Sequence, residues 1–250
     1  MVDSHPRRNS TDFRNDVAKK MATTWEGMTR TTNSIRLVSW DVDGTLYSIS
    51  RMKWHLMKLF LNHMFQGRAR LAAKELAALG RYRSQVDSVR EAGGILSESY
   101  LTQNQREALL ETETRWYGPA IHKAGPRKDV VEVISFFASR GIPQVVLSDY
   151  EAAYKLDSLG LTSRFASIYV GERLGFVKPN ARGFQHIAAD YQISAADILH
   201  IGDRIDRDDA AARAAGCQRL ILGQDFRSFG QLLAKLQRDF PRCFEKEAET

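Results

Sequence analysis

Two aspartates separated by one residue, Asp41 and Asp43, are the side chains in this sequence best placed to do chemistry. They follow a short, mostly apolar run from Ile35 to Trp40, and a run of this length flanked by polar residues predicts a buried strand. Side chains two residues apart on an extended chain point the same way. Both carboxylates are therefore expected at the carboxyl end of the strand, where parallel sheets bind their ligands. Gly44 then permits a sharp turn or a close approach by another group.

A pair of neighbouring carboxylates needs a partner, because the two charges repel each other unless a cation or a shared proton joins them. Mg²⁺ suits Asp41 and Asp43 because it prefers oxygen ligands. A carboxylate at such a site can also attack phosphorus and form an aspartyl-phosphate. The alternative interpretation is a strand end followed by an ordinary Asp-Gly turn.

Further polar residues stand where predicted strands end or in the loops just beyond them. Ser148 and Asp203 each follow a short predicted strand, and Asp208 stands five residues after Asp203. Lys178 lies in a loop just before a predicted helix. Each of these residues alone is of a type that is common in loops. Their order along one α/β chain favours a shared site over a series of unrelated turns.

Together these residues resemble the four ordered motifs of the haloacid dehalogenase superfamily. The resemblance covers about residues 35–50 and 126–224. It implies an α/β fold with a Rossmann-like parallel sheet and helices on both faces, plus an all-helical cap of the C1 type inserted after the first strand. It does not indicate the substrate. The motifs are Asp41-Val42-Asp43-Gly44-Thr45, Ser148, Lys178-Pro179, and Gly202-Asp203 followed by Asp208.

The resemblance implies a role for each motif residue. Asp41 would be the nucleophile that takes the phosphoryl group, and Asp43 would protonate the leaving oxygen and then activate water. Lys178 would neutralise the charge on Asp41 and on the phosphoryl group. The substrate phosphate would be bound by Ser148, Lys178, Thr45 and Gly44, and Mg²⁺ by Asp41, Asp203, Asp208 and the backbone carbonyl of Asp43.

Asp43 bears on the reaction class, because dehalogenases that resemble this family lack an acidic residue at that position. A halide leaves without a proton whereas an alkoxide does not, so Asp43 favours phosphate esters over haloacids. The sequence therefore predicts a Mg²⁺-dependent phosphomonoesterase. A phosphomutase would use the same aspartate pair, and a non-catalytic binding or scaffold protein could share the fold. Both remain alternatives.

Two features depart from the pattern of the family. Asp149 stands where many relatives have asparagine, and we expect its carboxylate to face away from the site or to cap the helix that starts at Glu151. The fourth motif also carries extra acids. Asp206 or Asp209 could therefore replace Asp208 as the outer carboxylate.

The elements that must position these residues follow from hydrophobic periodicity. From residue 126 on, short apolar strands alternate with amphipathic helices, which predicts a parallel sheet covered on both faces. Residues 49–125 show helical spacing only, with Gly80 and Gly118-Pro119 as predicted helix ends. We divide the chain into a polar leader (1–33), an α/β core (34–48 and 126–240), a helical cap (49–125) and a tail (241–250).

The first half of the predicted cap is strongly basic. Part of this face could meet an anionic substrate, and charge reversal of Arg81 and Arg83 would test this; a solvated helical face is the alternative. Aromatic residues of the cap could line an apolar pocket or fill the core of the cap. The basic residues are Arg51, Lys53, Lys58, Arg68, Arg70, Lys74, Arg81, Arg83 and Arg90, and the aromatic ones are Trp54, Phe60, Phe65 and Trp116.

The composition of the chain limits which partners and which cellular compartment we expect for it. The 250-residue chain has a net charge of +6, which favours anionic partners without identifying them. Its two cysteines, Cys217 and Cys243, lack a metal-binding spacing, which is typical of a reducing compartment. No apolar run approaches the ~20 residues that span a bilayer, and no signal peptide is recognisable. We expect a cytoplasmic enzyme with a small anionic phosphorylated substrate and no membrane partner. Nucleic-acid binding is a third alternative that the basic charge leaves open, and the oligomeric state stays open.

Overall fold

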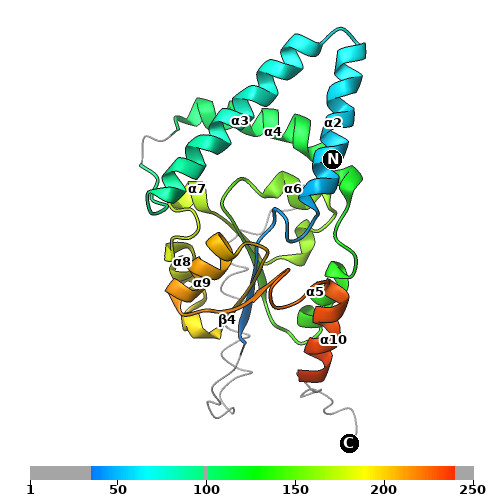
Figure 1. Ribbon diagram of the computed structural model, residues 1–250. Helices are drawn as coiled ribbons and strands as arrows, with labels where there is room; N and C mark the ends of the chain where they lie inside the picture. Colours follow the sequence, from blue (N-terminus) through cyan, green and yellow to red (C-terminus); the bar gives the residue numbers. More distant parts are fainter. Residues whose placement is uncertain (1–34, 98–100, 240–250) are drawn as a thin grey trace, which may run out of the picture. The chain divides into compact units, whose positions relative to one another are not determined.

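The computed structural model describes residues 35–97 and 101–239 (Figure 1). The predicted leader (1–33), the predicted tail (241–250) and Cys243 lie outside the described residues. The described residues all belong to one compact unit. Within these two ranges, no helix has the length and hydrophobicity of a membrane span.

Within the described residues, five parallel strands form the central sheet. They are β1 (Leu37–Trp40), β2 (Gln144–Ser148), β3 (Ser167–Val170), β4 (Ile198–Gly202) and β5 (Gln218–Ile221). They lie in the order β3-β2-β1-β4-β5, and every neighbouring pair is parallel. The predicted parallel sheet is confirmed. Because β1 lies between β2 and β4, the loops that follow these three strands emerge side by side.

Helices cover both faces of the sheet, as the alternation of strands and helices predicted (Figure 1). They are α8 (Arg182–Tyr191) and α9 (Ala210–Ala215) on one face, and α5 (Val130–Ala138) and α10 (Phe229–Asp239) on the other. Side chains alternate along a strand, so Leu37 packs towards α8 and α9, whereas Val38 and Trp40 pack towards α5 and α10. The sheet is therefore buried on both sides, and its carboxyl edge is left for a site.

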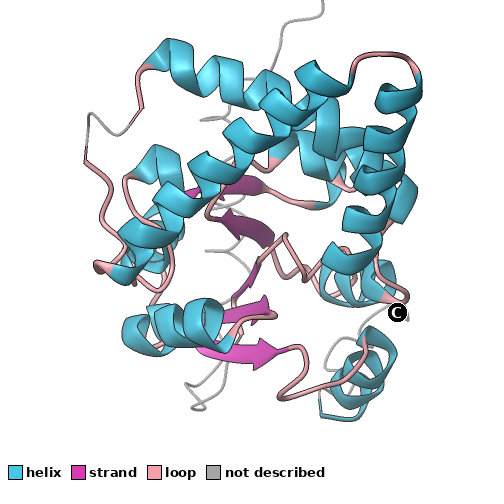
Figure 2. Ribbon diagram, turned by 45° about the horizontal axis from the view of Figure 1, so that its top comes forward, coloured by secondary structure: helices cyan, strands magenta, loops and turns pink. Residues whose placement is uncertain are grey.

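Three helices stand between β1 and α5 in the chain and lie together beyond the carboxyl ends of the strands (Figure 2). They are α2 (Ile49–Phe65), α3 (Ala69–Glu91) and α4 (Gln103–Ala124). We call residues 49–125 the insert. In its described residues all named elements are helical, as predicted; its function as a cap stays a prediction.

Two predicted helix ends in the insert are wrong. Helix α3 continues through Gly80, because Tyr82 and Val86 beyond it are buried and prolong its apolar face. Helix α4 continues through Pro119, because Ile121 beyond it is buried as well. Glycine costs an isolated helix about 1 kcal/mol and proline about 3 kcal/mol. The burial of large apolar side chains offsets such costs.

Short elements complete the loops at the carboxyl edge of the sheet. They are α6 (Ala153–Ser158) after β2, α7 (Gly171–Leu174) after β3, and the π-helical turn η3 (Ile205–Asp209) after β4. The helical segment after β4 is thus divided between η3 and α9. In η3 the N–H groups of Asp208 and Asp209 both donate to the carbonyl of Arg204. Such π-turns occur frequently at functional sites.

Candidate active site

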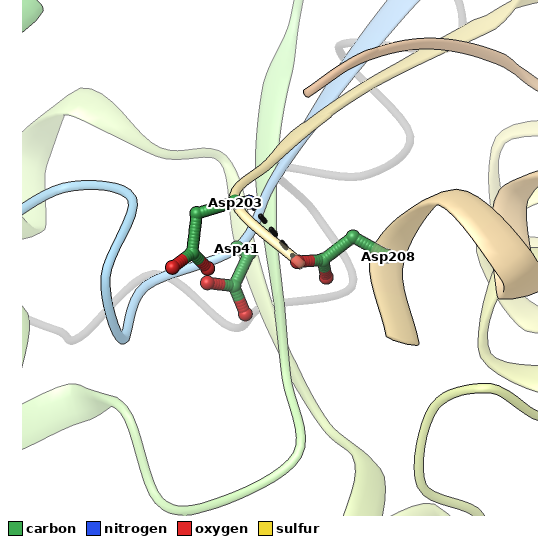
Figure 3. A group of neighbouring side chains, drawn as sticks. All are labelled: Asp41, Asp203 and Asp208. Carbon is green, nitrogen blue, oxygen red and sulfur yellow. Dashed lines mark hydrogen bonds between the residues drawn. The ribbon is translucent and has the colours of Figure 1, made fainter. Parts of the chain in front are cut away.

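Three acidic side chains meet where β1 and β4 end (Figure 3). Asp41 follows β1, Asp203 and Asp208 follow β4, and one carboxylate oxygen from each lies within 4.8 Å of the others. The sheet brings the two strand ends side by side through the pairing of Trp40 with Ile201. The fold thus brings together three acids that the sequence singled out, although they stand far apart in the chain.

Two glycines leave room for this cluster. At Gly44, where φ is +99°, a Cβ atom would lie 2.2 Å from Oδ2 of Asp203. At Gly202, a Cβ atom would lie 2.4 Å from Cγ of Asp208. Only glycine adopts the first conformation readily and allows either approach, so a side chain at these positions would displace a carboxylate.

Asp208 is the acid of the fourth motif that reaches the cluster. It is buried, and its Oδ2 accepts the N–H groups of Asp203 (3.1 Å) and Arg204 (3.0 Å). Asp206 is exposed and pairs with Arg204. Asp209 pairs with arginines of α9 and β5 instead. Neither of these acids takes the place of Asp208.

Lys178 is the cation that lies against this cluster. Its Nζ donates to Oδ1 of Asp41 (2.6 Å), to Oδ1 of Asp208 (2.7 Å) and to the carbonyl of Leu147 (3.2 Å). Burial alone would lower the pKa of Lys178, but Asp208 and Asp41 raise it above its usual value. The ammonium group is therefore charged at neutral pH.

The carboxylates of the cluster outnumber this cation. Burial raises the pKa of Asp41 well above its usual range, and Asp208 adds to the effect although Lys178 opposes it. Burial and Asp208 also raise the pKa of Asp203 to about 6. A divalent cation would relieve this excess of negative charge. The donor atoms are all carboxylate oxygens, which Mg²⁺ prefers, so the residues present fit this metal.

Asp43 stands two residues after Asp41, yet its carboxylate lies outside the cluster. Its Oδ2 accepts a hydrogen bond from Nζ of Lys155 (2.6 Å), and its Oδ1 accepts one from the hydroxyl of Tyr47. Burial would raise the pKa of Asp43, but Lys155 and Arg83 lower it to about 2. Asp43 is therefore ionised at neutral pH in this arrangement.

A small pocket lies at this edge of the sheet. Ser148, at the end of β2, lines it together with Asp41, Asp43 and Lys178. Thr45 is buried and donates from Oγ1 to Oδ2 of Asp41 (3.1 Å), so in this structure its hydroxyl orients the candidate nucleophile. The pocket therefore collects motif residues from three strand ends and from the loop of Lys178.

The positions of two cations beside Asp43 were not predicted, although Arg83 was among the basic residues expected to meet an anionic substrate. Lys155 belongs to α6 and is fully buried, although its segment of the sequence has the pattern of an ordinary amphipathic helix. The guanidinium of Arg83, on α3, lies over the rings of Tyr117 and Tyr150 and pairs with Glu113 (3.3 Å). Charged residues that meet from different helices leave no spacing in the sequence by which to find them.

Asp149 was expected to face away from the site or to cap the following helix, and this expectation is wrong. Oδ1 of Asp149 accepts the N–H of Lys178 (2.8 Å), and Oδ2 accepts a bond from Arg90 (3.1 Å). The residue that precedes α6 is Ala152, and no side chain caps that helix. Asp149 is thus engaged with the lysine loop, because a buried carboxylate needs hydrogen-bond donors and a counter-charge.

The expectations for the insert need a correction as well. Trp116 is buried in the hydrophobic core and Phe60 packs against that core, as the second alternative predicted. Trp54 and Phe65 are 49% and 90% exposed and fit neither alternative. Arg81 is exposed on α3, whereas Arg83 turns towards Asp43. The two arginines therefore do not act as a pair.

The family model described as haloacid dehalogenase-like hydrolase matches residues 35–216. A phosphoglycolate phosphatase of Photobacterium profundum is 24% identical over 224 residues, which cover 82% of this chain and 90% of that protein. A glyceraldehyde 3-phosphate phosphatase of Methanopyrus kandleri is 23% identical over 194 residues, or 73% of this chain and 81% of that protein.

Solved structures share the fold at lower identity. The HAD-hydrolase YfnB from Bacillus subtilis, bound to magnesium, has a TM-score of 0.58 and 19% identity, and the match covers 82% of this chain and 99% of that one. A β-phosphoglucomutase from Clostridium difficile has a TM-score of 0.55 and 15% identity, with 82% and 97% covered. These likenesses support the predicted fold class.

Proposed function

Because the chain belongs to the haloacid dehalogenase-like hydrolase family, we propose that it is a Mg²⁺-dependent phosphomonoesterase that forms an aspartyl-phosphate on Asp41. The observation that carries the proposal is the position of Lys178, whose Nζ lies 2.6 Å from Asp41 and 2.7 Å from Asp208. A buried ammonium beside a carboxylate nucleophile suits a reaction that moves a phosphoryl anion. The relatives named as phosphatases support this reaction class.

The cluster of acids is the proposed metal site. Asp41, Asp203 and Asp208, with the backbone carbonyl of Asp43, would hold Mg²⁺. When bound, the ion neutralises charge on the phosphoryl oxygens. Lys178 supplies a second, permanent positive charge beside Asp41.

In the first half of the proposed reaction, an Oδ atom of Asp41 attacks phosphorus and the bond to the leaving oxygen breaks. Asp43 gives its proton to that oxygen. Lys155 holds Asp43 ionised in the free enzyme, and a substrate phosphate next to Asp43 favours its protonation, because a neighbouring anion raises a carboxyl pKa. Ser148 donates a hydrogen bond to the phosphoryl group during the transfer.

In the second half, a water molecule attacks the phosphorus of the aspartyl-phosphate. The carboxylate of Asp43 takes a proton from that water, and the bond between phosphorus and Asp41 breaks. Inorganic phosphate leaves, and Asp41 is restored as a carboxylate. The ionised state of Asp43 that Lys155 favours is the state that this step needs.

We also propose that the insert is a cap and that Arg83 selects the substrate. Its Nε is buried and has no hydrogen-bond partner among the described residues, and its charge acts on Asp43. A leaving group that carries a carboxylate could satisfy this donor, because guanidinium and carboxylate form strong hydrogen bonds. The proposed substrate is therefore a small phosphate ester of a hydroxy acid.

Hydrolysis of purified phosphomonoesters tests both proposals. Wild type should release phosphate from 2-phosphoglycolate with Mg²⁺ and not with EDTA, and Asp41→Asn should be inactive. Arg83→Met should raise KM for 2-phosphoglycolate but not for glyceraldehyde 3-phosphate, whose leaving group has no carboxylate. Arg81→Met is the matched control and should change neither.

The alternatives correspond to other outcomes of this experiment. Transfer of phosphate between two positions of one sugar, without net release, would identify a phosphomutase. No Mg²⁺-dependent release from any phosphomonoester would favour a non-catalytic binding protein. The cytoplasmic location expected from the sequence stays a prediction.

A further inference from the structure

Arg90, near the end of α3, reaches from the insert to the loop that carries Lys178. It is buried, and its Nε donates to the carbonyl oxygen of Lys178 (2.9 Å). Its Nη2 donates to Oδ2 of Asp149 (3.1 Å), and Oδ1 of Asp149 accepts the N–H of Lys178 (2.8 Å). Both polar groups of the Lys178 main chain are therefore held by a single ion pair, and one member of that pair belongs to the insert.

The carboxylate at position 149 suits this arrangement better than an amide would. Asp149 uses one oxygen for Lys178 and the other for Arg90, whereas asparagine offers one acceptor oxygen and an amino group that cannot accept either bond. The planar guanidinium of Arg90 presents several donors in a fixed fork, so it reaches the carbonyl and the carboxylate together. Arg90 and Asp149 are therefore matched in charge and in geometry.

Backbone contacts join the same two segments next to this pair. The N–H of Leu96 donates to the carbonyl of Gly175, and the N–H of Val177 donates to the carbonyl of Gly94, each at 2.9 Å. A Cβ atom at Gly94 would lie 2.3 Å from the carbonyl oxygen of Val177, so the two chains approach closely. The contacts between the insert and this loop thus continue up to Lys178 itself.

We propose that Arg90 is a positioning residue for Lys178, through which the insert helps to assemble the active site. The inference rests on the proposed function, in which Lys178 balances the charge of Asp41 and of the phosphoryl group. Arg90 acts through the main chain of Lys178 and not through its ammonium group. If the insert lifted from the core, the bonds from Arg90 to Lys178 and Asp149 would break, so the lysine is fully positioned only while the insert lies on the core.

Amide hydrogen exchange of the full chain tests the proposal without any turnover. Peptides that span residues 175–181 should exchange faster in Arg90→Met than in wild type, because the main chain of Lys178 loses its link to α3. Arg81→Met, on the exposed side of the same helix, should exchange like wild type. Equal exchange in Arg90→Met and wild type would overturn the proposal, whether or not the proposed reaction is correct.

Steady-state kinetics distinguish a residue that positions Lys178 from one that only stabilises the folded protein. Arg90→Met and Asp149→Asn should each lower kcat about 10- to 100-fold, since small displacements of a catalytic group have effects of this size. The Mg²⁺ requirement and the circular dichroism spectrum should stay unchanged. The double variant should lose little more than the worse single variant, because both act through one interaction.

Chemical rescue is the most specific measurement. Guanidinium at low millimolar concentration should restore part of the activity of Arg90→Ala, whereas an equal concentration of sodium chloride should not. Arg90→Lys should recover less than wild type, because an ammonium group lacks the fork that reaches both partners. If the activity of Arg90→Ala fell only in proportion to the amount of folded protein, and guanidinium did not restore it, the positioning role would be contradicted. If wild type itself hydrolyses no phosphomonoester, the proposed function fails, and hydrogen exchange alone decides whether Arg90 holds the lysine loop.

Discussion

Asp41 and Asp43 stand two residues apart in the chain and lie in opposite electrostatic surroundings. Asp41 lies among acids that follow strands of the core, and burial with these acids raises its pKa. Asp43 lies against Lys155 of α6 and near the positive charge of Arg83, which lower its pKa to about 2. We call Asp41, Asp203, Asp208 and Lys178 the nucleophile side, and Asp43, Tyr47, Lys155 and Arg83 the leaving-group side.

The difference indicates which charge each side lacks. The nucleophile side has more carboxylates than cations, so it needs an added cation before Asp41 can be ionised, as the proposed reaction requires. The leaving-group side already has its cations, so it needs an added anion before Asp43 can carry a proton. Metal and substrate phosphate supply these two charges in the proposed reaction, and each of the following predictions perturbs one side and not the other.

The largest effect is expected on the nucleophile side. Asp41→Asn keeps the shape of the side chain but removes the attacking carboxylate, so kcat should fall by about 10⁴-fold or more for every substrate. The circular dichroism spectrum should match that of wild type. Incubation of the two proteins with substrate, followed by mass spectrometry, should detect the phosphorylated chain for wild type only. A phosphoryl group on another residue would refute the assignment of Asp41.

The next effect, on the leaving-group side, should depend on the substrate. Asp43→Asn removes the proposed general acid and base, and such a group typically raises the reaction rate roughly 10²- to 10⁴-fold. Phosphorylation of Asp41 by an alkyl phosphate should slow by this amount, because an alkoxide needs a proton to leave. The same step with p-nitrophenyl phosphate should slow much less, since that leaving group is stable as an anion. Single-turnover kinetics with both substrates measure the difference, and an equal loss would mean that Asp43 does not protonate the leaving oxygen.

The sequence predicted the nucleophile side because each of its residues follows a strand or lies in the loop before a helix. Once the strands are parallel and β1 is central, Asp41 and Asp203 have to emerge next to each other. Periodicity predicted the parallel strands and motif order predicted a shared site, whereas the strand order that makes β1 and β4 neighbours comes from the structure. Lys178 was recognised through its motif, and the structure adds the main-chain contacts that hold it.

The leaving-group side could not be predicted in this way. Lys155 and Arg83 come from different helices, and each approaches Asp43 only through the packing of α6 and of the insert on the core. A buried lysine in a short amphipathic helix has the sequence pattern of a surface lysine. The proposed role of Arg90 could not be predicted either, because it depends on hydrogen bonds to the carbonyl of Lys178 and to the carboxylate of Asp149, which lie far from Arg90 in the sequence.

Removal of the cation on the leaving-group side should have an intermediate effect. Lys155→Met removes the charge that lowers the pKa of Asp43, so this pKa rises, and the acidic limb of the profile of kcat against pH should move to higher pH. The activity at pH 7 should fall by roughly 10-fold, because less Asp43 is ionised for the attack of water. Lys123→Met, which changes an exposed lysine of α4, is the control and should leave the profile unchanged.

The smallest effect concerns the stability of the nucleophile side. The pKa of Asp203 is raised to about 6 by burial and by Asp208, so the folded protein holds a proton there more tightly than the unfolded chain does. In the absence of metal, this group stabilises the fold as the pH falls through about 6 and ceases to do so as the pH rises. Mg²⁺ should offset that loss at high pH, because it binds the ionised carboxylate.

Thermal unfolding measures this linkage. At a Mg²⁺ concentration ten times its Kd, binding contributes about 1.4 kcal/mol, which corresponds to a rise in Tm of roughly 3–6 °C for a chain of this size. The rise should be larger at pH 7.5 than at pH 5.5, where protons compete with the metal. Asp203→Asn should abolish it at both pH values, whereas Asp43→Asn should preserve it, because the carboxylate of Asp43 lies outside the cluster. Loss of the Mg²⁺ effect in Asp43→Asn would mean that the two sides share the metal, and the separation between them would no longer hold.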